Sequence, residues 1–146
     1  MFYFDTSFVA PLFLQEVTSD VVAAFMQNIP AGQLAVSYWT QVEFSSLLAR
    51  RVRMQDLTEE VALQTLKNFE NALINSYFMI MPTVEDFELA TQLLQHHHTG
   101  LRGGDALHLA ISKNHDAECL YSLDRGLVKA ASSLKIIAKM GIKVAK

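Results

Sequence analysis

The chain opens with the short apolar run Phe2-Tyr3-Phe4, which ends in Asp5, and a second run, Cys119-Leu120-Tyr121-Ser122-Leu123, ends in Asp124. Short apolar runs bounded in this way are typical of strands buried in a parallel sheet. Around them, strand-like and helix-like segments alternate. We expect strands at 2–5, 34–37, 77–81, 118–123 and 141–144, and helices at 7–14, 19–28, 39–53, 58–75, 84–97, 104–114 and 126–139. This alternation predicts an α/β fold with a mainly parallel sheet covered by helices on both faces.

The length and composition suit one compact domain spanning residues 1–146. Hydrophobic residues make up 51% of the chain and charged residues 18%, a balance that favours a folded protein over a disordered one. No apolar run reaches the roughly 18 residues of a membrane span, and the N-terminus does not resemble a signal peptide. Cys119 is the single cysteine, so it cannot form an internal disulfide. We therefore expect a cytoplasmic protein with no membrane partner.

Positive charge is concentrated towards the C-terminus, although the net charge is −3. The segment from Arg125 to Lys146 holds six of the 12 basic residues and none of the 15 acidic ones. A second basic group consists of Arg50, Arg51 and Arg53. Either group could follow a phosphate backbone. A solvated helix surface accounts for the same pattern equally well.

Four carboxylates lie next to or inside apolar segments: Asp5, Glu43, Asp105 and Asp124. Asp5 and Asp124 follow expected strands, Asp105 opens a helix after a glycine-rich loop, and Glu43 lies in the first turns of the helix after the second strand. Ligands of an open parallel sheet bind at the carboxyl ends of its strands, so we expect all four acids at one edge. There they would repel one another unless a cation neutralised them. Oxygen-only ligands favour Mg²⁺ or Mn²⁺.

Each of these acids also has a structural interpretation. Asp5, Asp105 and Asp124 precede helices, where an N-cap aspartate stabilises by about 1 kcal/mol, and Glu43 could be solvated. Helix caps need not gather at one edge, however, so the set as a whole favours a metal site. His108 could support one of the carboxylates, although a histidine of the core is the interpretation we favour. Hydrolysis of a phosphodiester in nucleic acid is the reaction that such a site would suit.

The acidic residues and their neighbours resemble a PIN-domain ribonuclease, most closely the VapC-type toxins of bacterial toxin–antitoxin pairs. The resemblance covers nearly the whole chain, in the order and spacing of all four acids. The stretch Leu-Arg-x-x-Asp-Ala-Leu-His-Leu-Ala at 101–110 is its most specific part. The other matching stretches are Asp5-Thr6-Ser7, Glu43 with Leu47-Leu48-Ala49-Arg50, and Ser122-Leu123-Asp124.

The resemblance implies a three-layer fold with a five-stranded parallel sheet. It also implies an endoribonuclease dependent on Mg²⁺ or Mn²⁺, a homodimer, and a cognate antitoxin as partner. Its implied site residues are the metal-binding, catalytic acids Asp5, Glu43, Asp105 and Asp124, the neighbouring hydroxyls of Ser7 and Ser122, and the basic residues Arg50 and Arg102 as RNA contacts. The charge pattern alone adds Arg51 and Arg53 to the expected RNA contacts.

Two other functions are compatible with the sequence. A PIN fold could bind RNA or protein without cleaving it, and the acids alone do not distinguish an RNA-directed nuclease from a DNA-directed or structure-specific one. The presence of all four acids argues against a pure binding module, because such a module has no use for a repulsive acidic pocket. The identity of the RNA target does not follow from the sequence.

Overall fold

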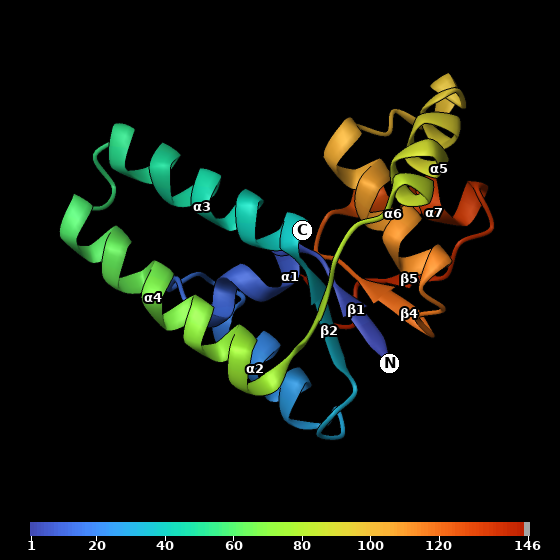
Figure 1. Cartoon of the computed structure of the whole chain (residues 1–146). Helices are drawn as coiled ribbons and strands as arrows, with labels where there is room; N and C mark the ends of the chain where they lie inside the picture. Colours follow the sequence, from blue (N-terminus) through green and yellow to red (C-terminus); the bar gives the residue numbers. More distant parts are fainter. Residues whose placement is uncertain (145–146) are drawn as a thin grey trace.

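A parallel five-stranded sheet lies at the centre of the protein (Figure 1), in a computed structural model that describes residues 1–144. The strand order is β3-β2-β1-β4-β5, and each neighbouring pair is parallel. The strands are β1 (Phe2–Phe4), β2 (Leu34–Ser37), β3 (Phe78–Ile80), β4 (Cys119–Tyr121) and β5 (Ala138–Lys139). The predicted α/β class is therefore confirmed, and β1 occupies the middle of the sheet between β2 and β4.

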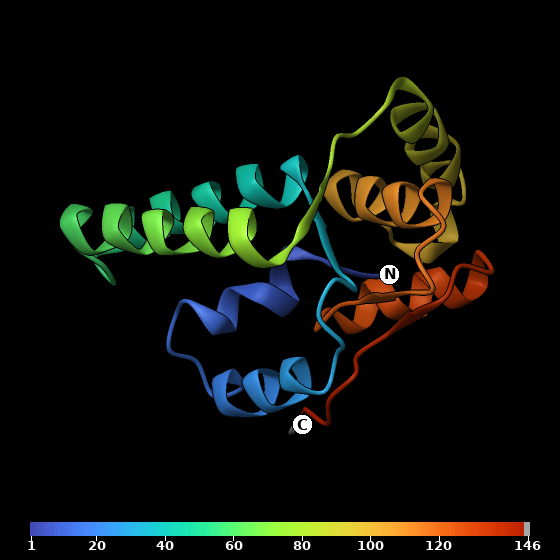
Figure 2. The ribbon, with the colours of Figure 1, turned by 60° about the horizontal axis from the view of Figure 1, so that its bottom comes forward.

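The segments between the strands are mainly helical. Within residues 1–144 the helices are α1 (Thr6–Val9), α2 (Ser19–Gln27), α3 (Tyr38–Arg53), α4 (Glu59–Ser76), α5 (Val84–Leu94), α6 (Gly103–Asn114) and α7 (Arg125–Ser133), with 3-10 turns η1 (Ala10–Leu12) and η2 (His97–Thr99). None of these helices combines the length and apolar character needed to cross a bilayer. The long pair α3 and α4 projects from the sheet as an antiparallel arm in Figures 1 and 2.

Polar caps set where the helices begin. Thr83 and Asp86 form a reciprocal capping box at the start of α5, and Ser37 with Thr40 forms another at the start of α3. The Thr58 side chain accepts a hydrogen bond from the backbone N–H of Val61 at the start of α4. The helix starts at Thr58 and Thr83 were expected from the sequence and are confirmed.

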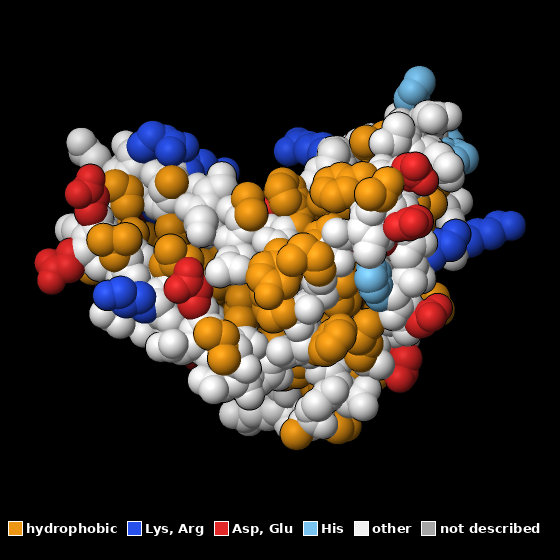
Figure 3. Space-filling model, viewed as in Figure 1, with side chains coloured by type: hydrophobic (Ala, Val, Ile, Leu, Met, Phe, Trp, Pro, Cys, Tyr) orange, Lys and Arg blue, Asp and Glu red, His pale blue; other side chains and the backbone are white. Residues whose placement is uncertain are grey.

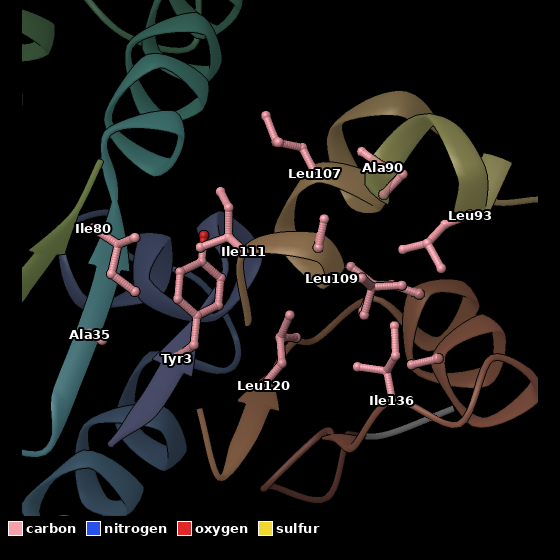
Figure 4. Packing of buried hydrophobic residues seen from close by; sticks show 14 residues of the cluster. Tyr3, Ala35, Ile80, Ala90, Leu93, Leu107, Leu109, Ile111, Leu120 and Ile136 are labelled. Atoms are coloured by element: carbon pink, nitrogen blue, oxygen red, sulfur yellow. The ribbon is translucent and has the colours of Figure 1, made fainter. Parts of the chain in front are cut away.

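Helices cover both faces of the sheet, as Figures 1 and 2 show, because successive strand residues point to opposite sides. Tyr3 belongs to a buried cluster with residues of α5, α6 and α7, and Figure 4 shows its ring rising from β1 towards α6. The next residue, Phe4, belongs to a second cluster with residues of α1 to α4. In that second cluster Phe44 of α3 stacks on Phe69 of α4 at a centroid distance of 4.1 Å. The three-layer arrangement is confirmed.

The C-terminal elements differ from the expectation. The helix expected at 126–139 ends at Ser133, and the strand expected at 141–144 is wrong, because the fifth strand is Ala138–Lys139. Lys135 takes a left-handed backbone conformation (φ 60°), and the Ile136 N–H bonds back to the carbonyl of Ala131. This stop turns the chain so that residues 138–139 pair with β4. Lys146 of the basic segment lies outside the described residues.

Two other helix ends were also misplaced. The helix expected at 7–14 divides into α1 and η1, because Pro11 has no N–H to continue an α-helix. The helix expected at 84–97 ends at Leu94. Cys119 is buried, as expected for a small core residue.

Candidate active site

The four acids gather at the carboxyl edge of the sheet. Asp5 follows β1 directly, Asp124 follows β4 after two residues, Glu43 lies in the second turn of α3, and Asp105 lies in the first turn of α6. The negative charges of Asp124, Asp5 and Glu43 all raise the pKa of Asp105, which shows that the four side chains share one electrostatic environment. The structure thus brings together the residues that the sequence placed at this edge.

Asp5 is the most deeply buried of the four, with 3% of its surface exposed. Its Oδ1 atom caps α1 by accepting the Phe8 N–H at 3.1 Å, and it also accepts the Ser7 hydroxyl at 2.7 Å. Burial raises the pKa of the Asp5 carboxyl above its ordinary value. A cap and a site carboxylate are therefore the same residue here, with Oδ1 engaged in the fold.

Ser7 and Ser122 tie the ends of β1 and β4 together. Their hydroxyl oxygens lie 3.2 Å apart, and the Ser7 hydroxyl also accepts the Leu123 N–H at 2.9 Å. The Ser122 hydroxyl accepts the Asp124 N–H at 3.0 Å. These bonds fix the backbone that carries Asp5 and Asp124, so both serines lie beside the acids and act on their placement.

Glu43 is held by two side chains from other elements. The Thr6 hydroxyl donates to Glu43 Oε1 at 2.6 Å, and His108 Nε2 of α6 makes a very short contact with the same oxygen. Burial by itself would raise the pKa of Glu43. The hydrogen bond and charge of His108, with the Thr6 hydroxyl, outweigh it and lower the pKa below its ordinary value. Glu43 therefore stays ionised in the acidic cluster.

Asp105 shows the opposite behaviour. Burial, followed by the charges of Asp124 and Asp5, raises its pKa from 3.8 to about 6. Near neutral pH this carboxyl therefore either binds a proton or carries a negative charge beside other negative charges. A site in which the pKa of one carboxyl is raised and the pKa of another is lowered is typical of a place that binds a cation or a proton in function.

Asp124 is exposed, and its side chain is engaged in capping α7. Its Oδ1 atom accepts the N–H groups of Gly126 at 2.8 Å and Leu127 at 3.2 Å. The capping interpretation of this residue is thus observed. It leaves Oδ2 without a role in the cap, and the charge of Asp124 still acts on Asp105.

The residues at this edge match the chemistry of a hard divalent cation. The donors are carboxylate and hydroxyl oxygens, and the pKa of Asp105 is raised first by burial and then by the negative charges of Asp124 and Asp5, which a bound cation would offset. In residues 1–144, no three acidic, histidine or cysteine side chains are already grouped closely enough to enclose an ion. Binding would thus require rotation of the side chains, of which Asp124 is the most exposed.

A cleft of about 670 Å³ leads away from the acids along α3. Glu43 and Asp124 line this cleft. Arg50 and Arg53 line it too, and they belong to α3, the helix that carries Glu43. The lining comes from α1, η1 and α3 and from the segments around Glu16 and Leu123. On the face seen in Figure 3, a separate hollow lies between α3 and the α5–α6 pair, with Lys and Arg side chains on both sides. The cleft therefore joins an acidic end to a basic wall.

The predicted basic contacts do not all face this cleft. Arg51 turns to Glu16 and forms an ion pair at 3.2 Å, while Arg102 is exposed at the N-cap position of α6. Of the four predicted RNA contacts, Arg50 and Arg53 line the same cleft as Glu43 and Asp124.

Three residues of the site were not singled out from the sequence. Thr6 and Gly104 were read only as parts of motifs, and Tyr3 as part of a strand. The position of Thr6 between Asp5 and Ser7 was the available signal, because its hydroxyl follows the strand directly and can reach a carboxylate at the same edge. His108 was considered as a supporting residue but assigned to the core, and the structure shows that it is both.

The PIN-domain sequence profile matches residues 2–132 of the chain. No curated protein sequence matches it at a significant level. Among solved structures, the chain is similar to the sarcin–ricin loop cleaving toxin VapC20 of Mycobacterium tuberculosis, with a TM-score of 0.73 and 19% identity over 94% of this chain and 97% of that one. It is also similar to a toxin–antitoxin complex from Klebsiella pneumoniae, with a TM-score of 0.70 and 18% identity over 99% and 100% of the two chains.

VapBC-1 from nontypeable Haemophilus influenzae is a third similar structure, with a TM-score of 0.71 and 11% identity over 98% of this chain and 100% of that one. Identities this low establish a shared fold and leave activity open. The match to the domain profile covers most of the chain and includes all four acids. The chain belongs to the PIN-domain family.

Proposed function

We propose that this PIN domain is a metal-dependent endoribonuclease that serves as the toxin of a toxin–antitoxin pair. The observation that carries the proposal is the acidic cluster at the carboxyl edge of the sheet, where burial and then the charges of the neighbouring acids raise the pKa of Asp105 to about 6. A fold gains nothing from such repulsion, whereas a cation site requires it.

Asp5, Glu43 and Asp105 would hold Mg²⁺ or Mn²⁺, with Asp124 completing the set. The ion would supply Lewis-acid stabilisation of the charge that develops on a scissile phosphate. The protein's own contribution is to keep Glu43 ionised through Thr6 and His108 and to keep Asp5 fixed on α1 and Ser7. The chain thereby presents carboxylate oxygens without needing to reorganise its backbone.

Arg50 and Arg53 would bind backbone phosphates on one side of the reacting one, because they line the cleft that leads from Glu43 along α3. Phosphate contacts of this kind position a strand without reading its sequence. Choice of a particular RNA would then depend on other contacts along the cleft. A PIN fold that only binds nucleic acid, and one directed at DNA, are the alternatives that the experiment must separate.

Partners form a further part of the proposal. The solved relatives include toxin–antitoxin complexes, which supports a cognate antitoxin as the binding partner. A homodimer is supported by hydrophobic residues exposed on β3, on α5 and on the segment that joins them (Figure 3), among them Phe78 at 61%, Met81 at 62%, Val84 at 70% and Phe87 at 55% exposed. Exposed apolar patches of this kind mark protein interfaces.

The test of the proposed function is expression of the chain in growing cells, alone and together with a candidate antitoxin, with sequencing of RNA 5′ ends. We expect growth arrest and new RNA ends at defined sites with the chain alone, and neither with the Asp5→Asn variant. Growth arrest with unchanged RNA but broken DNA would replace the RNA substrate by DNA. Unchanged RNA and DNA under growth arrest would favour a binding module.

A further inference from the structure

The two oxygens of the Glu43 carboxylate have different surroundings. Both side-chain contacts, from the Thr6 hydroxyl at 2.6 Å and from His108 Nε2, are made to Oε1. Within residues 1–144, Oε2 takes part in no hydrogen bond and lies against the backbone of α6 at Gly104. A Cβ atom at position 104 would lie 2.9 Å from Glu43 Oε2 and 3.4 Å from Cζ2 of Trp39. The carboxylate is thus anchored through one oxygen and open at the other.

His108 is itself fixed by a chain of hydroxyl groups. Its side chain is almost fully buried, and its Nδ1 atom lies 2.7 Å from the hydroxyl of Tyr3, which is fully buried. That hydroxyl lies 2.8 Å from Oγ of Ser37, the residue that caps α3. Figure 4 shows the Tyr3 ring between β1 and α6. The contacts therefore run from the N-terminus of α3 through β1 to α6 and return to α3 at Glu43.

The direction of these bonds follows from the groups involved. An ionised carboxylate only accepts hydrogen bonds, so His108 Nε2 must be the donor to Glu43. On the other side of the ring, Nδ1 faces the Tyr3 hydroxyl, which can donate or accept in that contact and takes the complementary role towards Ser37. Each group then has a consistent partner, and the ring orientation of His108 is determined before any ligand binds.

We infer that His108 is a positioning residue that engages Oε1 of Glu43 so that Oε2 is presented to a divalent cation, and that residue 104 is glycine because a side chain there would displace that oxygen. The inference rests on the proposed function, because Oε2 has a ligand to bind only if the site holds a cation. A histidine that merely filled the core would explain the burial of the ring. It would not explain why both donors bind Oε1 of Glu43. Nor would it explain why the residue beside Oε2 has no side chain.

The first experiment separates the two ring nitrogens. In His108→Gln the amide nitrogen stands where Nε2 was and can still donate to Glu43, whereas in His108→Asn it stands where Nδ1 was and cannot. Titration calorimetry with Mn²⁺, without RNA, is the readout. We expect affinity within about threefold of wild type for His108→Gln and a loss of roughly 10- to 100-fold for His108→Asn, the range found when a partner that orients a ligand is removed. Equal losses in both variants would overturn the inference.

The second experiment uses two adjacent glycines of α6. A Cβ added at Gly103 meets no atom within 4 Å, so Gly103→Ala is a matched control for Gly104→Ala. Glu43 Oε2 is the end of a flexible side chain, so Gly104→Ala can fold with that side chain turned away. We expect a loss of about tenfold or more in Mn²⁺ affinity for Gly104→Ala and none for Gly103→Ala. Melting curves in EDTA identify any variant that is not folded.

The outcomes distinguish this inference from the proposed function. If the wild type binds Mn²⁺ and cleaves RNA, but Gly104→Ala and His108→Asn bind as it does, the positioning role is wrong and the nuclease stands. If the expected affinities are found but no RNA is cleaved, the positioning role stands and the nuclease is wrong. If the wild type does not bind Mn²⁺, both are overturned.

Discussion

Replacing Asp105 by asparagine should stabilise the metal-free protein. The wild-type carboxyl has its pKa raised from 3.8 to about 6, by burial and by the charges of Asp124 and Asp5. That difference corresponds to about 3 kcal/mol at 1.36 kcal/mol for each pKa unit, and solvent screening at this partly exposed position reduces it to about 1–2 kcal/mol. Asn keeps the shape of the side chain and removes the charge. We expect a melting temperature roughly 3–6 °C above that of the wild type at pH 7.5 in EDTA.

The stability difference between Asp105→Asn and the wild type should depend on pH in a definite direction. Because the folded protein holds the Asp105 proton more tightly than the unfolded chain does, the wild type is penalised at pH values above about 6, where the carboxyl is ionised in both states. The penalty diminishes between pH 6 and 4 as the folded state takes up its proton, and it is absent below the unfolded pKa. The advantage of Asp105→Asn should therefore be full at pH 7.5 and should shrink as the pH falls towards 4.

Thermal melts in EDTA and in Mn²⁺ measure both effects, with Asp56→Asn as the control for removal of an exposed negative charge away from the cluster. Added Mn²⁺ should stabilise the wild type by RT ln(1 + [L]/Kd), which is about 2.7 kcal/mol at 100 times Kd, and should stabilise Asp105→Asn much less. An Asp105→Asn protein that melts at or below the wild type in EDTA at pH 7.5 would refute the repulsive cluster. So would an equal gain from Asp56→Asn.

Three further pairs of variants, each a test with its control, address other parts of the site and surface. Arg50→Ala should weaken RNA binding and flatten its salt dependence by about one counterion, whereas Arg51→Ala should leave that slope unchanged because Arg51 is paired with Glu16; a slope that Arg50→Ala leaves at the wild-type value would place Arg50 outside the RNA path. Asp124→Ala should lose the α7 cap and about 1 kcal/mol of stability in urea unfolding, and Asp124→Asn should retain most of it; equal losses would argue against the cap. If the proposed dimer forms through α5, the wild type should be a dimer in light scattering and Phe87→Lys a monomer, while Val17→Lys, equally a change of an exposed apolar residue, should remain a dimer; a Phe87→Lys protein that is still a dimer would exclude the α5 surface, and a monomeric wild type would exclude the dimer.

Much of the fold could be predicted because local signals agree with the tertiary structure. The run before Asp5 and the run before Asp124 are buried neighbouring strands, and the capping signals at Thr58 and Thr83 mark real helix starts. The fifth strand could not be predicted, since it has only two residues and depends on the left-handed turn at Lys135. The apolar alternation at 141–144 is a local pattern typical of a strand, but these residues pair with no neighbouring strand.

The site could be predicted as a set of residue types but not as a set of contacts. Connectivity alone places the four acids at one edge of the sheet. Which oxygen of Glu43 is engaged depends on His108, 65 residues away in the chain, and no spacing rule reports that contact. The pairing of Arg51 with Glu16 and the cap formed by Asp124 are likewise choices of side-chain direction, which packing decides after the backbone is in place.

The rate of cleavage of a defined RNA by the purified protein, measured with Mn²⁺, with Mg²⁺ and with EDTA, tests the central claim most directly. We expect cleavage with either ion, none in EDTA, and a loss of at least about 100-fold for Asp105→Asn, because one interaction with the developing charge commonly contributes that much. Cleavage that persists in EDTA, or that Asp105→Asn performs at the wild-type rate, would contradict the account.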